Sequence, residues 1–574
     1  MSRADRSADS ANRAIAGLIA GNFDPEALRR GQFRFFATLA PNRVLISVAS
    51  GVLGGIAYAL LVPLILLSVA PVDPLLSEFI DNAMPIVWGW EIQHPRFAIA
   101  FLVLCFLAML ARAASQIVFG NVTAEAAARL RLYLSERIRR VPIQDLEAIG
   151  STRVHSAMTL DVSRLVETAS NLPVVLINVS TIVCALGFIA FLHLKVFLLV
   201  LGVMVFGVIS YRVPLVVGQR LFARARESRD GIQDSIEGQL SGAKELKLNA
   251  EKYQDFMDSG MRKEEADVVR FVNRGNIVFY LSLQYGNLVG FLAIGAVTYA
   301  ATPLYGLTTE LLISVVMAML YIIGPIAAIV NAVPIMAQGA VALNKLNELL
   351  DRMPVEALEE HGTALECRTL RLEDVSYSYP RRDSFEVGPV SLSLRRGQVT
   401  FIVGGNGSGK STLAKLISGH YRPNAGRVLF DDTVIDDSNL FRARQSVSAI
   451  FLDFHLFTHL FGHGAPDMEL AERYLKRLGL AHKVSLQGNR FSTTDLSDGQ
   501  RKRLALLVAF MEKRNLCVFD EWAADQDPEF KRVFYTELLP ELRRQERIVV
   551  VISHDDKYFD QADQLIHMES GRLQ

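Results

Sequence analysis

Residues 44–70, VLISVASGVLGGIAYALLVPLILLSVA, contain no charged side chain. A helix needs about 20 apolar residues to cross the hydrocarbon core of a bilayer. In lipid every backbone polar group must be bonded within the segment, which restricts a single spanning segment of this kind to a helix. The run is too long for the apolar core of a secretory signal peptide. The sequence therefore predicts a first membrane span at 44–70.

Further apolar runs follow in the first half of the chain, and together with the first they predict six spans. The boundary between the third and fourth spans is the least distinct. The five further runs cover about 97–119, 173–192, 196–216, 276–301 and 309–336.

Basic residues are distributed unevenly between the loops. Lys and Arg are concentrated in 121–164 and 217–274, whereas 71–95 and 302–308 have none. Cytoplasmic loops carry the excess of Lys and Arg, so this asymmetry predicts that both termini and the two long loops are cytoplasmic. The stretches AEAAARLRLYLSERIRR and RARESRDGIQDSIEGQLSGAKELKLNAEKYQDF have helical patterns, and we expect them to extend the third and fifth spans beyond the membrane as coupling helices.

Few ionisable side chains lie within the spans, which argues against an ion-coupled carrier, because such carriers need buried charges along the ion path. Gln284 and Asn287 stand near Gly286 and Gly290, a pair at GxxxG spacing. These residues either line a cargo cavity or pack helices together, and the small-residue spacing favours packing.

Charge and cysteine usage exclude other classes. The formal net charge is zero, so there is no basic domain to indicate nucleic-acid binding. The four cysteines are widely separated, lack metal-site spacing, and are interpreted as small buried hydrophobic residues. They are Cys105, Cys184, Cys367 and Cys517.

The character of the chain changes after Pro354, where short apolar strands begin to alternate with amphipathic segments. We predict an all-α transmembrane domain of six helices followed by an α/β P-loop nucleotide-binding domain. The expected boundaries are a cytoplasmic segment at 1–43, the membrane domain at 44–350, a linker at 351–367 and the nucleotide domain at 368–574.

A P-loop stands at 399–412, VTFIVGGNGSGKST, where a β-rich segment leads through G-x-x-x-x-G-K-S into a helix. Glycines let backbone N–H groups face phosphates at a helix N-terminus, Lys adds a positive charge, and the Ser hydroxyl can ligate Mg²⁺. The motif predicts Mg·ATP binding. The residues assigned to ATP here are Gly404, Asn406, Gly407, Ser408, Gly409, Lys410, Ser411 and Thr412.

Two adjacent acids, Asp520 and Glu521, follow the apolar run that begins at Leu516. At the end of a strand beside the P-loop, Asp520 is suited to hold Mg²⁺ together with Ser411. Glu521 is then suited to polarise the attacking water. The alternative, in which the acid pair only caps the next helix, is less favoured because of the P-loop upstream.

These motifs together resemble the ABC transporter superfamily over nearly the whole chain. The resemblance rests on the P-loop, LSDGQ at 496–500, VFDE at 518–521 and SHDD at 553–556. It implies a homodimer in which Ser497, Gly499 and Gln500 contact the ATP bound by the other subunit.

By the same resemblance, His554 is the switch histidine that acts with Glu521. Asp527 lies in the D-loop, and Tyr379 stacks on adenine. These three roles are implied by the family.

Two positions depart from the family pattern. Leu452 occupies the place of the Q-loop glutamine, with Asp453 next to it. Leucine cannot ligate a metal, so either Asp453 or water replaces the amide at Mg²⁺, or coupling differs in this chain. Asp498 in the signature adds a negative charge near a triphosphate unless it points away or caps the helix.

The domain order resembles an exporter-type half-transporter. FDEWAADQDPEF, DFHLF and GQRKRLAL are most similar to bacterial exporters of cyclic peptides and peptide siderophores, such as the pyoverdine and syringomycin exporters. This implies ATP-driven export of an amphipathic peptide across a bacterial inner membrane, in contact with lipid. A lipid or lipid-linked flippase is an alternative, and a weakly hydrolysing regulatory protein is another.

Overall fold

The computed structural model describes residues 25–29, 31–69, 86–87, 90–91, 95–356, 363–379, 385–462 and 466–574. These residues form two compact units, each described by itself. The first unit comprises Met1–Tyr133 and Ser156–Glu348, and the second comprises Leu134–His155 and Leu349–Gln574. Most of the expected N-terminal segment, much of the loop at 71–95 and part of the linker at 351–367 lie outside the described residues.

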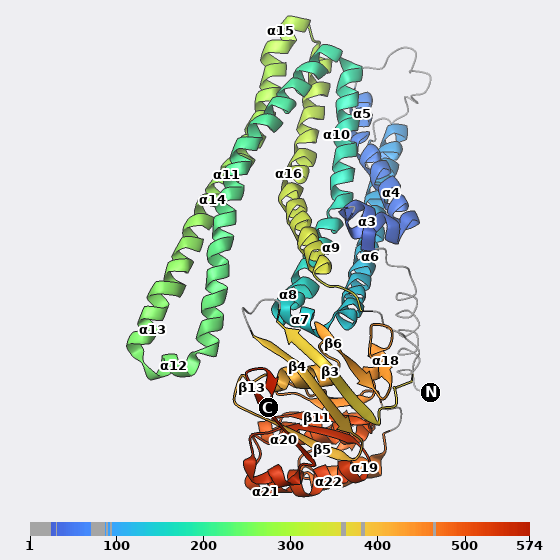
Figure 1. Ribbon diagram of the computed structural model, residues 1–574. Helices are drawn as coiled ribbons and strands as arrows, with labels where there is room; N and C mark the ends of the chain where they lie inside the picture. The colour runs from blue at the N-terminus through green and yellow to red at the C-terminus, as the bar shows by residue number, and fades with distance from the viewer. Residues whose placement is uncertain are drawn as a thin grey trace. The chain divides into compact units, whose positions relative to one another are not determined.

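The first unit is almost entirely helical (Figure 1). Its elements, with the long helices that continue into the second unit, are α2 (Pro25–Arg29), α3 (Gln32–Leu39), α4 (Pro41–Ala59), α5 (Leu61–Val69), β1 (Ile86–Val87), β2 (Trp90–Glu91), α6 (Pro95–Arg140), the π-helical turn η2 (Ala157–Asp161), α9 (Val162–Ser170), α10 (Leu172–Leu192), α11 (Leu194–Ser241), α12 (Ala243–Leu248), α13 (Ala250–Phe256), η3 (Met257–Met261), α14 (Arg262–Gly295), η4 (Ala296–Ala301), α15 (Thr302–Tyr305) and α16 (Thr309–Asp351).

Within the described part of the chain, six helical segments are long and apolar enough to cross a membrane, as the sequence predicted. The third and fourth spans are separate helices. His193 has an extended backbone between them, and its Nδ1 accepts a hydrogen bond of 3.3 Å from Val196 N at the start of α11. The six segments are Pro41–Leu66, Arg96–Arg140, Ser151–Leu192, Leu194–Ser241, Ala250–Tyr305 and Thr309–Asp351.

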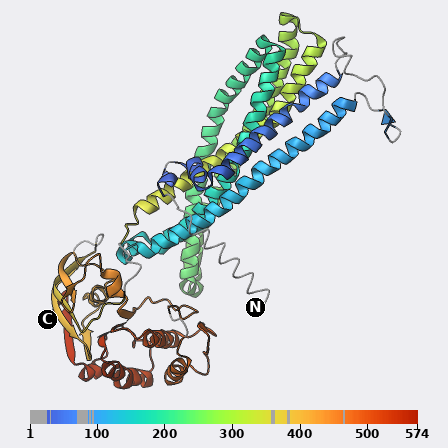
Figure 2. The same ribbon diagram turned by 90° about the vertical axis from the view of Figure 1, so that its right-hand side faces the viewer.

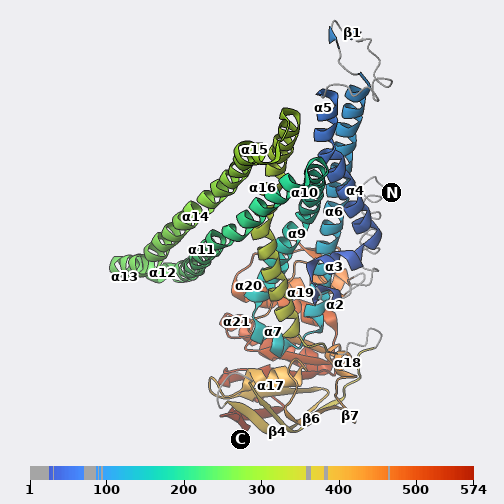
Figure 3. The same ribbon diagram turned by 90° about the horizontal axis from the view of Figure 1, so that it is seen from above.

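The first basic stretch extends the second span and not the third, whereas the second stretch extends the fifth span, as expected, and the fourth span as well. Residues 124–140 continue the second span, because α6 runs unbroken until Pro142 follows it (Figure 2). Residues 224–256 are divided between two spans, since Gly242 ends α11 and α13 leads into α14. α11 and α14 lie side by side as a long hairpin in both Figure 1 and Figure 3.

Close glycine-mediated helix packing is found on α4 and not at the Gly286–Gly290 pair. A Cβ atom added to Gly54 would lie 2.7 Å from a side-chain carbon of α6, and one on Gly55 would lie 2.6 Å from a carbonyl oxygen of α10. By contrast, a Cβ on Gly290 would meet α16 at 3.4 Å, and one on Gly286 would meet no atom of the described chain within 4 Å. Close backbone approach therefore joins α4, α6 and α10.

The second unit combines two sheets with surrounding helices. Its elements are α7 (Ile143–Ile149), α8 (Ser151–Ser156), β3 (Thr369–Ser378), β4 (Glu386–Arg395), β5 (Gln398–Val403), α17 (Lys410–Ile417), β6 (Ala425–Phe430), β7 (Thr433–Val434), α18 (Leu440–Arg444), β8 (Val447–Ile450), α19 (Met468–Arg477), β9 (Leu486–Gln487), β10 (Arg490–Phe491), α20 (Asp498–Glu512), β11 (Leu516–Asp520), α21 (Pro528–Val533), η5 (Phe534–Leu538), α22 (Leu539–Arg544), β12 (Ile548–Ile552), η6 (Asp556–Gln561), β13 (Gln564–Glu569) and β14 (Arg572–Leu573).

The larger sheet has the strand order β14-β13-β5-β12-β11-β8, and β13, β5, β12, β11 and β8 are parallel. An antiparallel sheet, β4-β3-β6-β7, accompanies it. Strands β11 and β12 are buried along their whole length, as expected for parallel strands covered on both faces. In the register, Ile402, Ile552 and Asp520 lie at one level, so the loops after three neighbouring strands open at the same edge.

Candidate nucleotide-binding and hydrolysis site

The P-loop connects β5 to α17 as predicted. Gly404 has φ 151°, and a Cβ added there would lie 2.2 Å from Met568 O. Gly409 has φ 101°, and a Cβ there would lie 2.7 Å from a side-chain carbon of Val387. Both positions therefore require glycine, for conformation and for space.

Lys410 is folded into this loop. Its Nζ donates hydrogen bonds to the carbonyl oxygens of Gly404 at 3.0 Å and Gly405 at 2.9 Å. Burial lowers the pKa of Lys410, and the nearby carboxylates of Glu521 and Asp520 oppose that shift. The loop therefore places a positive charge among the backbone groups that phosphates would contact.

A buried hydroxyl in the loop tests whether these residues fit a nucleotide. Ser408 Oγ is buried, and among the described residues it has no hydrogen-bond partner. A buried polar atom without a partner costs free energy, so it is expected to meet one when the site is filled. The P-loop residues thus fit a phosphate group, and ATP is the ligand that the motif predicts.

Asp520 and Ser411 meet at the edge of the sheet. Ser411 Oγ donates a hydrogen bond of 3.2 Å to Asp520 Oδ1, and the Asp520 side chain is buried. Burial raises the pKa of Asp520, while the hydrogen bond from Ser411 lowers it. A carboxylate and a hydroxyl are oxygen ligands of the kind that Mg²⁺ prefers, so this pair fits the predicted metal.

Glu521 and His554 form the next pair along the same edge. His554 Nε2 and Glu521 Oε1 are 3.2 Å apart, and both side chains are partly exposed. Glu521 has φ 50°, a left-handed conformation that is uncommon for a residue with a Cβ. Its backbone N donates to Ile552 O at 3.1 Å, which ties this turn to β12.

The signature motif forms the start of α20. Ser497 caps the helix and Gln500 returns the bond in a capping box. The side chain of Asp498 is 88% exposed, and its nearest cation is Arg501 at 3.9 Å. Whether Asp498 opposes a triphosphate bound by a second subunit stays a prediction.

The D-loop is attached to the signature helix. Gln526 Nε2 donates to Gly499 O at 3.0 Å, and Arg503 donates to Gln526 Oε1 at 2.8 Å and to Asp527 Oδ2 at 2.7 Å. Asp527 caps α21, and the backbone N–H of Phe530 lowers the pKa of Asp527, with Arg503 also contributing. Asp527 therefore lies beside the signature motif of its own chain.

Leu452 and Asp453 follow β8, whose last residue, Ile450, pairs with Phe519 next to Asp520. Both side chains are exposed, and among the described residues Asp453 has no ion pair or hydrogen bond. The metal role considered for Asp453 stays a prediction. Tyr379 lies at the P-loop helix, where its hydroxyl is 2.9 Å from Thr412 Oγ1, and its adenine contact is likewise untested.

Sequence reasoning missed a second polar cluster, which joins α7 to the nucleotide domain. Glu147 of α7 accepts hydrogen bonds from Lys415 Nζ at 2.8 Å and from the Tyr421 hydroxyl at 2.5 Å. Ile143 of α7 packs against the apolar core beneath the P-loop helix. Lys415 belongs to α17, so a helical turn between two spans contacts the helix that the P-loop begins.

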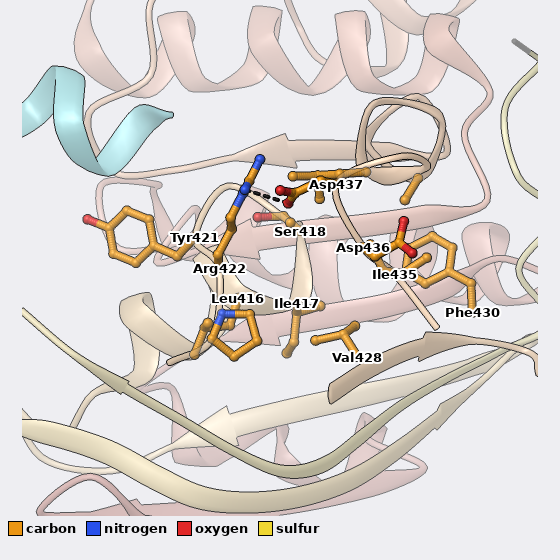
Figure 4. A pocket seen from close by; sticks show the side chains of 14 residues that line it. Leu416, Ile417, Ser418, Tyr421, Arg422, Val428, Phe430, Ile435, Asp436 and Asp437 are labelled. Carbon is orange, nitrogen blue, oxygen red and sulfur yellow. Dashed lines mark ion pairs between the residues drawn. The ribbon is translucent and has the colours of Figure 1, made fainter. Parts of the chain in front are cut away.

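A cavity of about 200 Å³ lies beside this cluster, lined by the end of α17 and by residues near β6 and α18. At its rim Arg422 forms an ion pair of 2.5 Å with Asp437, drawn as a dashed line in Figure 4. Arg422 also lies 3.3 Å from Glu356, which Arg444 binds at 2.6 Å. These residues are 66 or more positions from Glu356 in sequence, and no local pattern could have identified them.

Comparison with known proteins matches both units. The profile described as "ABC transporter" matches residues 387–524, and the profile described as "ABC transporter transmembrane region" matches residues 59–326. The first range contains the P-loop, the signature and the acid pair, while Tyr379 and His554 lie outside it.

Among curated proteins, the chain is 33% identical over 488 residues to "ATP-binding protein SyrD" of Pseudomonas syringae pv. syringae, covering 82% of this chain and 86% of that protein. It is also similar to proteins named "ATP-dependent lipid A-core flippase". The one from Photobacterium profundum is 22% identical with 88% of each chain covered, and the one from Chromobacterium violaceum is 26% identical with 79% and 80% covered.

Proposed function

Since this chain belongs to the ABC transporter family, as an ATP-hydrolysing transporter of the exporter type, we propose that it exports a cyclic or modified peptide across the bacterial inner membrane. The cargo is a peptide siderophore or a related amphipathic peptide. The working unit is a homodimer with two Mg·ATP sites at its interface, and both termini and the nucleotide domain are cytoplasmic.

The observation that supports this proposal most directly is the meeting of three strand ends at one edge of the sheet. They carry Lys410 after β5, the Ser411–Asp520 pair at the end of β11, and the Glu521–His554 pair joined across 3.2 Å. Bound Mg·ATP supplies the phosphoanhydride bond whose cleavage drives transport.

The chain's own residues then divide the work. Lys410 offsets phosphate charge, and Ser411 with Asp520 holds the metal. Glu521 accepts a proton from the attacking water, and the imidazole of His554 orients the Glu521 carboxylate.

A homodimer follows from the resemblance, in which the signature of one subunit grips the ATP of the other. The residues 387–524 matched here form one nucleotide domain, and a second copy of the chain would supply the ATP that Ser497 and Gly499 contact. The N-terminus of α20 suits this role because helix N-termini favour anions.

The peptide cargo is supported by three local motifs that resemble cyclic-peptide and siderophore exporters, and by the match with SyrD over most of both chains. A lipid flippase is the second candidate, favoured by the relatives named for lipid A-core flipping. Arg112 also favours it, because this cation lies within the second span, 4.6 Å from the ring centre of Tyr58, where it can meet an anionic headgroup.

A weakly hydrolysing regulatory protein is a third candidate, suggested by Leu452 and Asp498. The pairing of Glu521 with His554 favours hydrolysis.

The test is the ATPase rate of the full-length protein in lipid nanodiscs, for wild type and Glu521→Gln, with cyclic peptides, siderophore precursors and phosphorylated lipids as additives. We expect Glu521→Gln to lose about 100-fold or more in kcat, as for removal of a general base. The exposed Glu472→Gln on α19 is the control and should match wild type. We expect stimulation by a peptide class and not by lipid; stimulation by lipid alone would replace export of peptide with flipping.

A further inference from the structure

Lys502 is a buried cation outside the motifs that predict ATP binding. It lies in the second turn of α20, and its side chain is only 5% exposed. Its Nζ donates to the backbone oxygen of Glu521 at 3.2 Å and forms an ion pair of 2.6 Å with Asp525 Oδ2. A buried lysine is expected only where partners satisfy it, and both partners here belong to the loop that begins with Glu521.

The backbone of Glu521 is the part of the site that most needs support. A left-handed conformation is unfavourable for a residue with a Cβ, and it persists only where the surroundings impose it. The backbone N of Glu521 is held by β12, and its backbone O accepts hydrogen bonds of 3.2 Å from both Ala524 N and Lys502 Nζ. The Ala524 bond lies within the loop itself, so Lys502 is the group that ties the backbone of Glu521 to α20.

The same loop and helix are joined a second time by a bond in the opposite direction. Trp522, which is fully buried, donates from Nε1 to the backbone O of Lys502 at 2.8 Å. Together with the Arg503 and Gln526 bonds, these contacts join the signature helix to residues 521–527 at several points. A displacement of α20 is therefore expected to change the position of Glu521.

We propose that Lys502 is a positioning residue for ATP hydrolysis. It fixes the backbone of Glu521 and ties it, through Asp525, to the helix that carries Ser497 and Gly499. Glu521 acts on the ATP bound by its own subunit, whereas the signature motif contacts the ATP bound by the other subunit. Through Lys502, the helix that carries the signature motif thereby aligns Glu521. The inference rests on the proposed role of Glu521 and on the proposed homodimer.

A purely structural role for Lys502 predicts that Lys502→Met lowers the melting temperature together with kcat, whereas a positioning role predicts a lower kcat alone. Removing one partner of an ion pair destabilises a protein mainly where the remaining charge stays buried and unpaired. Asp525 is 55% exposed, so water can solvate its carboxylate once Lys502 is gone. Lys502→Met is therefore expected to fold and to keep its thermal stability, while losing the alignment of Glu521.

The experiment compares Lys502→Met, Asp525→Asn and the double variant in the full-length protein in nanodiscs, with Arg501→Met as the matched control. Arg501 is the preceding residue of α20, is 41% exposed and lies 3.9 Å from Asp498. We expect Lys502→Met to lose about 30-fold in kcat with KM for ATP unchanged within about twofold, because small misplacements of a reacting group cost up to about 100-fold. Asp525→Asn should lose about threefold, and the double variant should be no slower than Lys502→Met.

Three results would overturn the inference. One is Lys502→Met within twofold of wild type, the second is an equal loss in Arg501→Met, and the third is a kcat loss that is accompanied by a fall in the melting temperature. Multiplying losses in the double variant would also count against it, because they would mean that the two side chains act separately. The ATPase rate of Glu521→Gln is measured alongside. If Glu521→Gln has lost ATPase activity and Lys502→Met has not, only the inference about Lys502 fails. If Glu521→Gln keeps its ATPase activity, the proposed hydrolysis site fails.

Discussion

Two short helices, α7 and α12, lie between long spans, and they differ in the contacts that they make within the chain. α7 follows the second span, and its Glu147 is bonded to Lys415 and Tyr421 of the nucleotide domain. α12 follows the fourth span and is flanked by exposed apolar side chains. Leu240 is 75% exposed and Leu248 is 87% exposed.

The contrast lies in what each helix offers to a partner. α7 is held by charged and hydrogen-bonding groups that its own chain supplies, so its attachment should respond to pH and to single charge changes. The residues flanking α12 offer apolar surface, and contacts made by such surface do not depend on the protonation of a side chain. In the proposed homodimer, the second copy is the natural partner for that surface.

The largest expected effect is acid sensitivity beside α7. Burial, with Arg444 and Lys415, lowers the pKa of His420 to about 4, against an ordinary value of 6.5. The unfolded chain therefore takes up a proton as pH falls through 6.5, whereas the folded chain does so only near pH 4. Stability contributed by neutral His420 is complete above pH 6.5 and falls by up to about 3 kcal/mol between pH 6.5 and 4.

Thermal melting at pH 7.5 and pH 5 checks this expectation. His420→Asn should show a smaller acid-induced fall in melting temperature than wild type, by several degrees. The exposed His482→Asn should behave as wild type. An identical acid response in His420→Asn would show that another group controls it.

The next effect concerns the bonds of α7. Glu147→Ala leaves Lys415, only 20% exposed, without its ion pair, and removes the acceptor of the Tyr421 hydroxyl. Glu147 is itself 42% exposed, so solvent screening limits the expected loss to about 1 kcal/mol. Cargo-stimulated ATPase should fall about fivefold with little change in the basal rate, because α7 would transmit less of the movement of the spans to α17.

Glu147→Gln sharpens this test, since the amide oxygen can still accept from Tyr421 while the ion pair is lost. ATPase assays with and without cargo should place it between wild type and Glu147→Ala. Equal stimulation in all three proteins would mean that α7 does not depend on this cluster.

The smallest effect is expected at α12. Leu248→Ser changes an exposed side chain, so the unfolding free energy of the detergent-solubilised monomer should change by no more than about 0.5 kcal/mol. The melting temperature of the monomer should therefore shift only slightly. In nanodiscs, by contrast, the dimeric fraction measured by mass photometry should decrease, because apolar contact area is lost. A marked fall in monomer stability would show that Leu248 packs within its own subunit and would remove the contrast with α7.

The family and the fold could be predicted because their signals are local. Apolar runs of about 20 residues or more, with few charges, identified the six spans, and G-x-x-x-x-G-K-S between an apolar strand and a helix identified the nucleotide domain. The error about which span the first basic stretch extends has a local cause as well. Helix ends depend on individual breakers such as Pro142, which hydropathy does not weigh.

The roles of Tyr379, Asp453, Ser497, Glu521, Asp527 and His554 stay predictions from residue type and family resemblance. What the structure adds to them is geometry, for example the 3.2 Å between Glu521 and His554, which are 33 residues apart. Leu452 and Asp498 are exposed, and that could not be read from a pattern of residue types.

The sequence by itself determined which segments are able to span a membrane and which part of the chain is the nucleotide-binding domain, since hydropathy and motif spacing act over a few residues. Only the tertiary structure decided which charges are neutralised, and by which partners. Glu147 meets Lys415 across 268 residues, and Lys502 meets Glu521 across 19, through the packing of a helix against a strand end. A charged residue looks alike in sequence whether solvent or a buried partner satisfies it, because burial is a property of the packed chain.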